Sequence, residues 1–395
     1  MLKLLTEKII KDKSIISLYV CKFLIAFSNF VVTYLTFYLV NYKKMSPQSA
    51  GIIITIVAFS YVPATLIGGK ISFVGIREKL AFFFLISGCC YVIVPVISTL
   101  YFQLLCIVMG KIFLTITEPM IMGILNNRAN DVREKKNIFS SIYLFTNLGF
   151  ALGPLVAGSI YTRNIYLIFV FDGVLKILVA VIIYLFFVED VRLNESTRVK
   201  HEYLKVINGS PTLLIFAVLV MVINWIYFQT DFSLPILFEK LYGAGGVKFY
   251  SFVMTTNALV IIVGTKLVNR ITIDFKSYSS VIIAGVLFSF AYAGYALFSN
   301  MILFVFMTAI WSIGEILFYT NYTICINEIV GERFFSEAYA LINSISRIIS
   351  ILNPMIIGFV LKIANIQNIL MFLSLTMMFV TIMYIPLRKK IYEYS

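Results

Sequence analysis

The chain has 395 residues, of which 61% are hydrophobic and only 13% are charged, and its mean hydropathy is +0.96. A soluble domain carries about twice that share of charged residues, so composition excludes this class. The formal net charge of +13 would suit a nucleic-acid-binding protein. We reject that interpretation because the basic residues lie in short segments between apolar runs, as in the loops of a membrane protein.

A basic N-terminal segment, residues 1–13, precedes twelve apolar runs. Each run is near the roughly 20 residues that a helix needs to cross about 30 Å of hydrocarbon. The predicted spans are 17–40, 48–69, 79–99, 101–126, 138–161, 165–188, 212–238, 248–268, 278–299, 301–327, 336–361 and 367–387. The longest polar stretch, residues 189–211, divides them into an N-terminal half, 1–188, and a C-terminal half, 212–395. We therefore predict an all-α, multi-pass protein of the cell (plasma) inner membrane, with the lipid bilayer as its surroundings.

The basic residues also predict orientation. Of the 32 Lys and Arg residues, 22 lie in segments on one side of the predicted membrane, six lie on the other side, and four lie within spans. Cytoplasmic loops carry the excess of basic residues, so both termini and the 189–211 linker are expected in the cytoplasm. The connections on the external side are too short to hold a catalytic or binding domain there.

The first span carries a polar stripe of Lys22, Asn29 and Thr33 at helical spacing, and we assign Asn29 and Thr33 to a substrate cavity. Lys22 is long enough to reach the inner headgroups instead. After the second span, Gly68 and Gly75 stand seven residues apart and Arg77 follows them. This loop resembles the signature loop of the major facilitator superfamily, although Ser72 occupies the position of its usual acid. The alternative is a simple basic turn.

The fourth span places Lys111 and Glu118 seven residues apart on one face, where they resemble that family's fourth-helix pattern, Arg-x-x-x-Gly-x-Gly-Glu. Ionisable residues within a span are costly and usually face a cavity or a partner. On the sixth span, Asp172 and Lys176 are four residues apart, and we interpret them as a structural ion pair.

The fifth span contains Gly149, Gly153, Pro154 and Gly158. Its glycines leave a strip without side chains, so a neighbouring helix can approach closely. Close packing alone would explain Gly-x-x-x-Gly, but the whole pattern resembles the antiporter motif of the drug:proton antiporters in that superfamily, with Ala157 replacing a glycine. These residues, with Gly68, Gly75, Arg77 and Arg347, form our predicted gating and packing set.

Part of this pattern returns in the second half of the chain. Pro354 and Gly358 repeat the spacing of Pro154 and Gly158, and Arg133 and Arg333 each stand 21 residues before their proline. Several matches in register indicate a duplicated half, and parallel repeats of six helices are one known architecture of secondary transporters.

Two later spans add candidate cavity residues. On the seventh, Asn224, Phe228 and Asp231 share a face, and the run through Gln229 resembles the family's cavity-lining seventh helix. On the tenth, polar and aromatic side chains form one stripe, for which a packed interface is the alternative; its members are Trp311, Glu315, Tyr319 and Tyr322. On the eleventh, Arg347 is placed to neutralise Glu315.

The sequence argues against an enzyme. It contains no nucleophile–histidine–acid set, its one histidine lies in the linker, and its five cysteines have no metal-like spacing. It also has no Gly-Lys-Ser/Thr phosphate loop, so ATP is not the expected energy source. We therefore expect no cofactor and no metal, and secondary transport is the remaining function. Burial favours the neutral form of a carboxyl, so Glu315, followed by Glu118 and Asp231, are the candidate proton carriers.

The resemblance implies a twelve-helix major facilitator fold and proton-coupled efflux of amphipathic or cationic small molecules by alternating access. Its partners would be a small-molecule substrate and protons, and we expect a monomer. Two alternatives stay open. One is an importer or facilitator of a nutrient or anion, which Lys22, Lys111 and Arg347 would suit. The other is a sensor that kept the fold and lost transport, which the altered signature loop would suit.

The topology gives a first test. We predict that a cysteine introduced by Ser196→Cys, in the linker, is not labelled by a membrane-impermeant thiol reagent in intact cells, because the linker lies in the cytoplasm. Labelling is expected only after the cells are lysed. Labelling of intact cells would show that the orientation is reversed.

Overall fold

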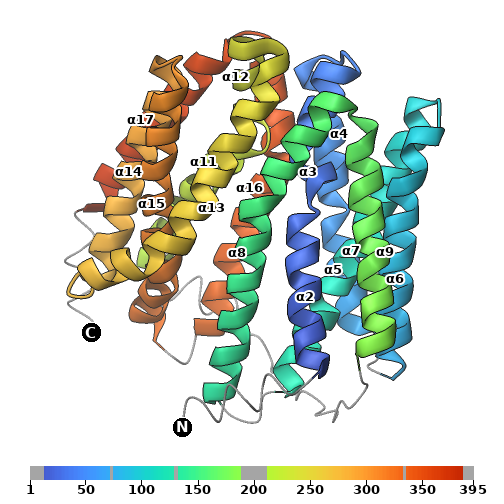
Figure 1. Ribbon diagram of the computed structural model, residues 1–395. Coiled ribbons are helices and arrows are strands. Elements are labelled where there is room, and N and C mark those ends of the chain that lie inside the picture. The colour runs from blue at the N-terminus through green and yellow to red at the C-terminus, as the bar shows by residue number, and fades with distance from the viewer. Residues whose placement is uncertain (1–12, 72–73, 129–131, 188–210, 332–334, 386–395) are drawn as a thin grey trace. The chain divides into compact units, whose positions relative to one another are not determined.

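The computed structural model describes residues 13–71, 74–128, 132–187, 211–331 and 335–385. The described residues form helices and connecting turns, without β-strands, as predicted for an all-α protein (Figure 1). Ser72, Arg333 and the linker up to residue 210 lie outside the described residues. The side chain of Arg133 is not described either.

The helices of the first half are α2 (Lys13–Phe27), α3 (Phe30–Phe37), α4 (Pro47–Phe59), α5 (Tyr61–Lys70), α6 (Ile76–Ile93), α7 (Leu100–Arg128), α8 (Val132–Arg163) and α9 (Tyr166–Phe186). Those of the second are α11 (Pro211–Tyr227), α12 (Ser233–Tyr242), α13 (Gly246–Ile271), α14 (Ser277–Leu297), α15 (Met301–Val330), α16 (Phe335–Val360) and α17 (Ile366–Tyr384). Short π or 3₁₀ segments are η1 (Tyr38–Tyr42), η2 (Val94–Val96), η3 (Phe228–Thr230) and η4 (Gly243–Gly245).

Grouped into continuous segments, the described helices provide twelve spans that are long and apolar enough to cross a membrane. This confirms the predicted number. In hydrocarbon no water is present to pair with the backbone, so helices that satisfy their own N–H and C=O groups are the expected spanning elements. Three spans consist of more than one α-helix: α2 and α3 form the first, α4 and α5 form the second, and α11, η3 and α12 form the seventh.

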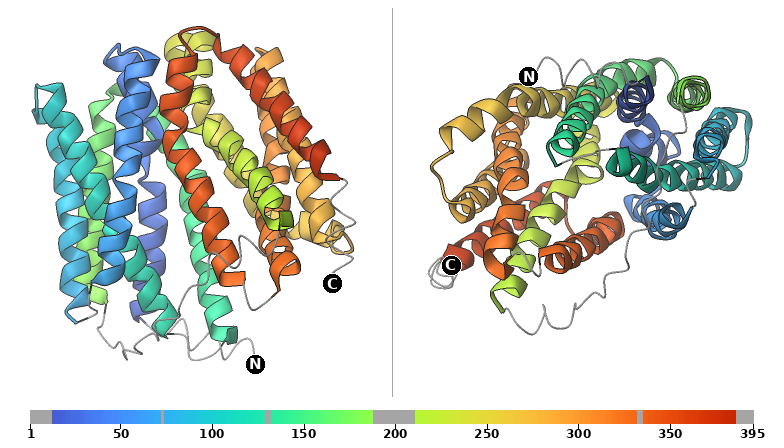
Figure 2. Two further views of the ribbon diagram at one scale, coloured as in Figure 1. Left: turned by 180° about the vertical axis from the view of Figure 1, so that it is seen from behind. Right: turned by 90° about the horizontal axis from the view of Figure 1, so that it is seen from below.

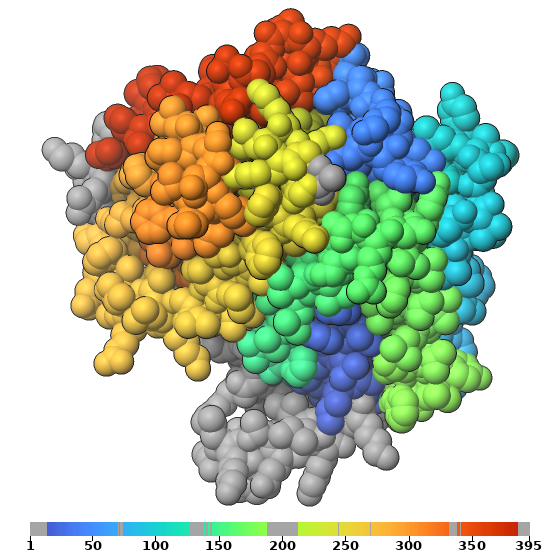
Figure 3. Space-filling model, turned by 45° about the horizontal axis from the view of Figure 1, so that its top comes forward, coloured from blue at the N-terminus to red at the C-terminus, as the bar shows by residue number. Residues whose placement is uncertain are grey.

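The chain divides into two compact units. The first unit is Met1–Leu35 with Ile56–Thr197, and the second is Thr36–Thr55 with Arg198–Ser395. The main division lies between Thr197 and Arg198, inside the predicted linker 189–211, and the connection between the first two spans is grouped with the C-terminal helices. In Figure 3 this connection, in blue, lies beside the red C-terminal helices.

Small residues explain why that connection packs in the second unit. A Cβ atom added to Gly51 would collide with the carbonyl oxygen of Pro354, and one added to Gly358 would lie 2.7 Å from that of Pro47. The backbone N–H of Met355 donates to the hydroxyl of Thr55 at 3.2 Å. The repeated Pro-Gly pattern of α16 is therefore a close packing surface for α4.

Within the first unit, two helix pairs meet at glycines. Helices α6 and α9 lie side by side (Figure 2), and a Cβ on Gly88 would lie 2.6 Å from the carbonyl oxygen of Gly173. Helix α8 packs on α2 through Gly149 and Gly153. A Cβ on Gly153 would lie 2.5 Å from the carbonyl oxygen of Phe27, so the close approach expected from the glycine strip is present.

The other residues of the gating and packing set occupy separate places. Gly158 is buried in α8, and the hydroxyl of Tyr34 donates to the carbonyl oxygen of Pro154 at 3.0 Å. Gly68 packs on α7, where an added Cβ would lie 2.6 Å from Cγ of Pro119. Gly75 has φ of 63°, a left-handed conformation that favours glycine, and it precedes α6.

Arg77 contacts an acidic and an aromatic side chain near the start of α6. Its Nη2 atom lies 2.7 Å from Glu78, and its guanidinium lies 5.4 Å from the ring centroid of Tyr184 on α9. The contact with Tyr184 links the start of α6 to α9 within the first unit.

Gly153→Leu tests the packing of the fifth span. We expect it to abolish transport while the protein still inserts, because the leucine side chain must displace the backbone at Phe27. Gly69→Leu is the matched control, since a Cβ there meets no atom within 4 Å. Efflux of a fluorescent dye and the amount of protein in the membrane would be measured for both variants. Normal efflux by Gly153→Leu would remove any special role for this glycine.

Candidate functional site

The second unit contains a carboxyl group at the midpoint of a spanning helix. Glu315 is halfway along the 30-residue α15 and is 8% exposed. Asn257 of α13 donates from Nδ2 to Oε2 of Glu315 at 2.8 Å and to the hydroxyl of Ser312 at 3.0 Å. Tyr227, at the end of α11, also interacts with this carboxyl. Three helices thus converge on Glu315.

Aromatic side chains surround this group. The ring centroid of Tyr227 lies 5.8 Å from that of Trp311 and 6.0 Å from that of Tyr319, in edge-to-face arrangements. Trp311 is buried, whereas Tyr319 is 40% exposed and its hydroxyl donates to Asn224 at 3.2 Å. The predicted stripe on α15 therefore combines one carboxyl group with several ring faces, which suit an organic cation.

Further along the stripe, Tyr322 is mostly buried and its hydroxyl donates to that of Tyr339 on α16 at 3.2 Å. Arg347, also on α16, is exposed. The hydrogen bonds described for Glu315 come from neutral side chains, and within the described part of the chain no salt bridge joins it to Arg347. The neutralising pair that we considered from the sequence is therefore not formed in this structure.

The seventh span is interrupted beside these residues, and Asn353 holds the interruption in place. Asn353 is 1% exposed and directly precedes Pro354 in α16. Its Oδ1 atom accepts from Nε1 of Trp225 at 2.8 Å and from Nε2 of Gln229 at 2.7 Å. Its Nδ2 atom donates to the carbonyl oxygen of Phe228 at 3.3 Å.

Three of the predicted cavity or proton residues belong to this interruption. Gln229 is fully buried, and its side-chain amide also forms hydrogen bonds with Ser233 and with the carbonyl oxygen of Trp225. Its polar atoms therefore stabilise the interrupted span. The ring centroid of Phe228 lies 5.6 Å from that of Tyr227. Asp231 is exposed, and its backbone carbonyl accepts from the hydroxyl of Thr36 at 2.8 Å.

The first unit contains a cavity of about 300 Å³, which we call the α2–α7 cavity. Its polar lining comes mainly from the first and fourth spans, and its residues are Lys22, Ile25, Ala26, Asn29, Tyr61, Lys111, Leu114, Thr115, Thr117, Glu118, Thr146 and Phe150. The structure thus brings together Asn29 and Lys111, which the sequence assigned to a cavity. Thr33 lies beside this group and accepts a 3.4 Å hydrogen bond from Asn29.

An ion pair joins the two helices that form this cavity. The Nζ atom of Lys22 lies 2.6 Å from Oε2 and 2.7 Å from Oε1 of Glu118. The Lys22 side chain is 7% exposed and that of Glu118 is 43% exposed. Lys22 therefore neutralises Glu118 and does not reach outward to the headgroups.

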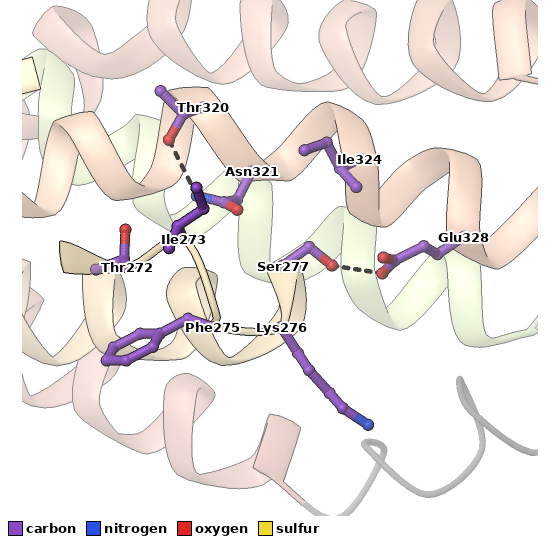
Figure 4. Close-up of a pocket in the computed structure, with 9 residues that line it drawn as sticks. All are labelled: Thr272, Ile273, Phe275, Lys276, Ser277, Thr320, Asn321, Ile324 and Glu328. Atoms are coloured by element: carbon purple, nitrogen blue, oxygen red, sulfur yellow. Dashed lines mark hydrogen bonds between the residues drawn. The ribbon is translucent and has the colours of Figure 1, made fainter. Parts of the chain in front are cut away.

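A second cavity, of about 470 Å³, lies where α13, α14 and α15 meet (Figure 4). The hydroxyl of Ser277 donates to Glu328 there, and the remaining polar lining residues are Thr272, Lys276, Thr320 and Asn321. It contains none of the residues that the sequence singled out, and Ile273 in its wall is 77% exposed. Among the described residues, no cluster of histidine, cysteine or carboxylate side chains could hold a metal ion.

Sequence reasoning missed Asn257 and did not single out Tyr227, although both interact with Glu315. Asn257 was detectable, because it is a lone amide within an apolar span and such a group needs a partner in the membrane. Tyr61 and Thr146 of the α2–α7 cavity gave no comparable signal, since one polar residue at a helix edge is common.

Comparisons with known proteins agree with this architecture. The family model of the Major Facilitator Superfamily matches residues 18–354. Among solved structures, the nucleoside transporter NupG has a TM-score of 0.77 at 14% identity, with 95% of this chain and 99% of that chain covered. A POT family transporter in complex with 5-aminolevulinic acid has a TM-score of 0.75 at 15% identity, with 95% and 96% covered.

A bacterial homologue of the human lysosomal transporter Spinster, in an inward-facing and occupied conformation, has a TM-score of 0.67 at 14% identity, with 96% of each chain covered. At such identities these structures establish the fold alone. Among curated protein sequences, none matches this chain significantly. The family match covers most of the chain, and the twelve spanning helices agree with it: the chain belongs to the major facilitator superfamily of membrane transporters.

Proposed function

We propose that the protein is a proton-coupled exporter of amphipathic or cationic small molecules, and that Glu315 carries the coupled proton. The observation that carries this proposal is the environment of Glu315, which is buried at mid-span among neutral hydrogen-bond partners. A charged carboxylate is costly to bury without a cation, and binding a proton removes that cost. Release of the proton then requires that the site become wetter or gain a cation in another state.

The other candidate proton carriers have different surroundings. Glu118 is already neutralised by Lys22 at 2.6 Å, so protonation of Glu118 would leave a mostly buried lysine without its counterion. The side chain of Asp231 is exposed, whereas that of Glu315 is buried. Glu315 is therefore the first candidate, and Glu118 and Asp231 follow it.

The substrate class follows from the surroundings of Glu315. Tyr227, Trp311 and Tyr319 present ring faces and edges next to one carboxyl group. Such a site attracts a flat, weakly hydrated organic cation through cation–π contacts and through the carboxylate charge. Substrate and proton would then compete for Glu315, which is one simple way to couple export to proton entry.

The α2–α7 cavity favours the rival function, transport of an anion. It places two lysines and one glutamate around a space of about 300 Å³. This excess of positive charge would suit a carboxylate or phosphate group. The two functions predict opposite signs for the transported molecule, so transport assays can separate them.

Glu315→Gln tests the proposed proton carrier. We expect this variant to lose export of ethidium against a gradient, by at least about tenfold, while it keeps downhill exchange of ethidium, with weaker binding because the carboxylate charge is lost. Glu328→Gln on the same helix is the matched control, because Glu328 lies at the cavity of Figure 4 and should leave export unchanged. Ethidium accumulation would be measured in cells before and after collapse of the proton gradient.

The outcomes of that experiment are distinct. Wild-type pumping by Glu315→Gln would assign the proton to another group, with Asp231 as the next candidate. Ethidium accumulation that is unaffected by the protein or by the gradient would instead favour the anion importer or the sensor without transport.

Lys111→Gln tests the rival function. If the protein exports cations, removal of this positive charge should leave ethidium export unchanged or raise it up to about tenfold, because a repelling charge is lost. If the protein transports an anion, the same change should strongly reduce uptake of an anionic probe such as a fluorescent carboxylate. Comparing both probes on wild type and Lys111→Gln decides between the two.

A further inference from the structure

The first spanning helix is broken, and the break is where its backbone hydrogen bonds change partners. Helix α2 ends at Phe27 and α3 begins at Phe30. Between them, the N–H of Asn29 donates to Ala26 and the N–H of Phe30 donates to Ser28, so the regular i to i−4 pattern stops. The first N–H groups of a new helix have no partner within it and need an acceptor from elsewhere.

That acceptor comes from the sixth span. Oδ2 of Asp172, on α9, accepts the backbone N–H of Val31 at 2.8 Å. The contact joins residues 141 positions apart in the sequence, so it is a built tertiary contact. A carboxylate in this position also interacts favourably with the positive end of the helix dipole.

The other carboxylate oxygen of Asp172 bonds to Lys176 one turn later in α9. Both side chains are 1% exposed, and the ammonium of Lys176 lies 5.0 Å from the ring centroid of Tyr91. The close crossing of α6 and α9 at Gly88 and Gly173 brings Tyr91 next to this pair. Lys176 therefore compensates the charge of Asp172, which leaves the second oxygen available for Val31.

The break has a second support on its other side. The carbonyl oxygen of Phe27, the last residue of α2, faces Gly153 of α8, where an added Cβ would lie 2.5 Å away. Asn29, inside the break, lines the α2–α7 cavity and donates to Thr33. The position of Asn29 thus depends on where the two helix segments separate.

We propose that Asp172 is a positioning residue: its carboxylate holds the first spanning helix broken at Ser28 and Asn29, and so places Asn29 in the wall of the α2–α7 cavity. Lys176 is the counterion that makes this buried acceptor tolerable. A simple structural ion pair, as the sequence suggested, would not need the contact with Val31. The proposal holds for either direction of transport and for any substrate.

Two double variants separate the acceptor from the charge. Asp172→Asn with Lys176→Met removes both charges but keeps an amide oxygen that can accept from Val31. Asp172→Leu with Lys176→Met removes both charges and the acceptor. Double variants are needed because a single change would leave an uncompensated buried charge, whose cost would hide the effect of interest.

The reporter is a cysteine introduced by Asn29→Cys after the five native cysteines are replaced. Its rate of reaction with a small cationic methanethiosulfonate reagent would be measured on purified full-length protein. Thr146→Cys is the matched reporter, because Thr146 lines the same cavity from α8 and does not belong to the broken helix.

We expect Asp172→Leu/Lys176→Met, which lacks the acceptor, to change the rate at position 29 by about tenfold, the effect of leaving one buried N–H without its partner. Asp172→Asn/Lys176→Met should stay within about twofold of the parent, and the Thr146→Cys rate should stay within about twofold in both. Equal rates at position 29 in the two double variants would overturn the proposal. A parallel change at both reporters would also overturn it, because it would indicate general loosening.

Discussion

The rest of this structure depends on one constraint: backbone N–H and C=O groups inside a bilayer need hydrogen-bond partners from the protein, because no water is present there. A continuous helix meets it alone, but the first and seventh spans are interrupted, and each interruption needs partners from another helix. In the first span the partner is the carboxylate of Asp172, which accepts from Val31 at 2.8 Å. In the seventh it is the amide of Asn353, which donates to the carbonyl oxygen of Phe228 at 3.3 Å.

The interruptions of the first and seventh spans are supported differently. Asp172 belongs to the sixth span and carries a charge that Lys176 must balance, whereas Asn353 belongs to the eleventh span and is neutral. Because Asn353 is neutral, it adds no charge to the part of the second unit that contains Glu315. Because Asp172 is charged, the first unit depends on its buried ion pair with Lys176. Changing one partner alone would leave the other charge buried without compensation.

Charge is also distributed unequally between the candidate sites. In the first unit, Glu118 and Asp172 each lie against a lysine. In the second unit, Glu315 receives hydrogen bonds from neutral groups and is surrounded by aromatic rings. A carboxyl that already has a counterion gains little from a proton, while one without a counterion gains much. This difference is the physical reason to place proton binding in the second unit.

Much of the fold was predictable from the sequence, because the length and apolar character of the spans follow directly from the thickness of a bilayer. The close approach of the fifth span was predictable from Gly149 and Gly153, and helical spacing indicated that Lys111 and Asn29 could face a cavity, whose lining contains both. The interruptions were not, because Ser28 and Asn29 are compatible with a regular helix and their acceptor is 141 positions away. Pairings such as Asn257 with Glu315 depend on which helices touch, which periodicity along one helix does not contain.

The glycine motif of the fifth span packs against the broken first span. The glycine strip of the fifth span is usually understood as a surface that lets two helices slide or pack closely. Here Gly153 faces the carbonyl oxygen of Phe27, the residue at which α2 ends, while Tyr34 in α3 donates to the carbonyl oxygen of Pro154. The motif therefore contacts both segments of the broken helix, one on each side of the break. Bulk at Gly153 would act on Phe27, and loss of the acceptor at Asp172 would act on Val31, which flank the break that contains Asn29. The packing motif of the fifth span and the part of the cavity wall that contains Asn29 are in this sense joined through the same segment of the first span.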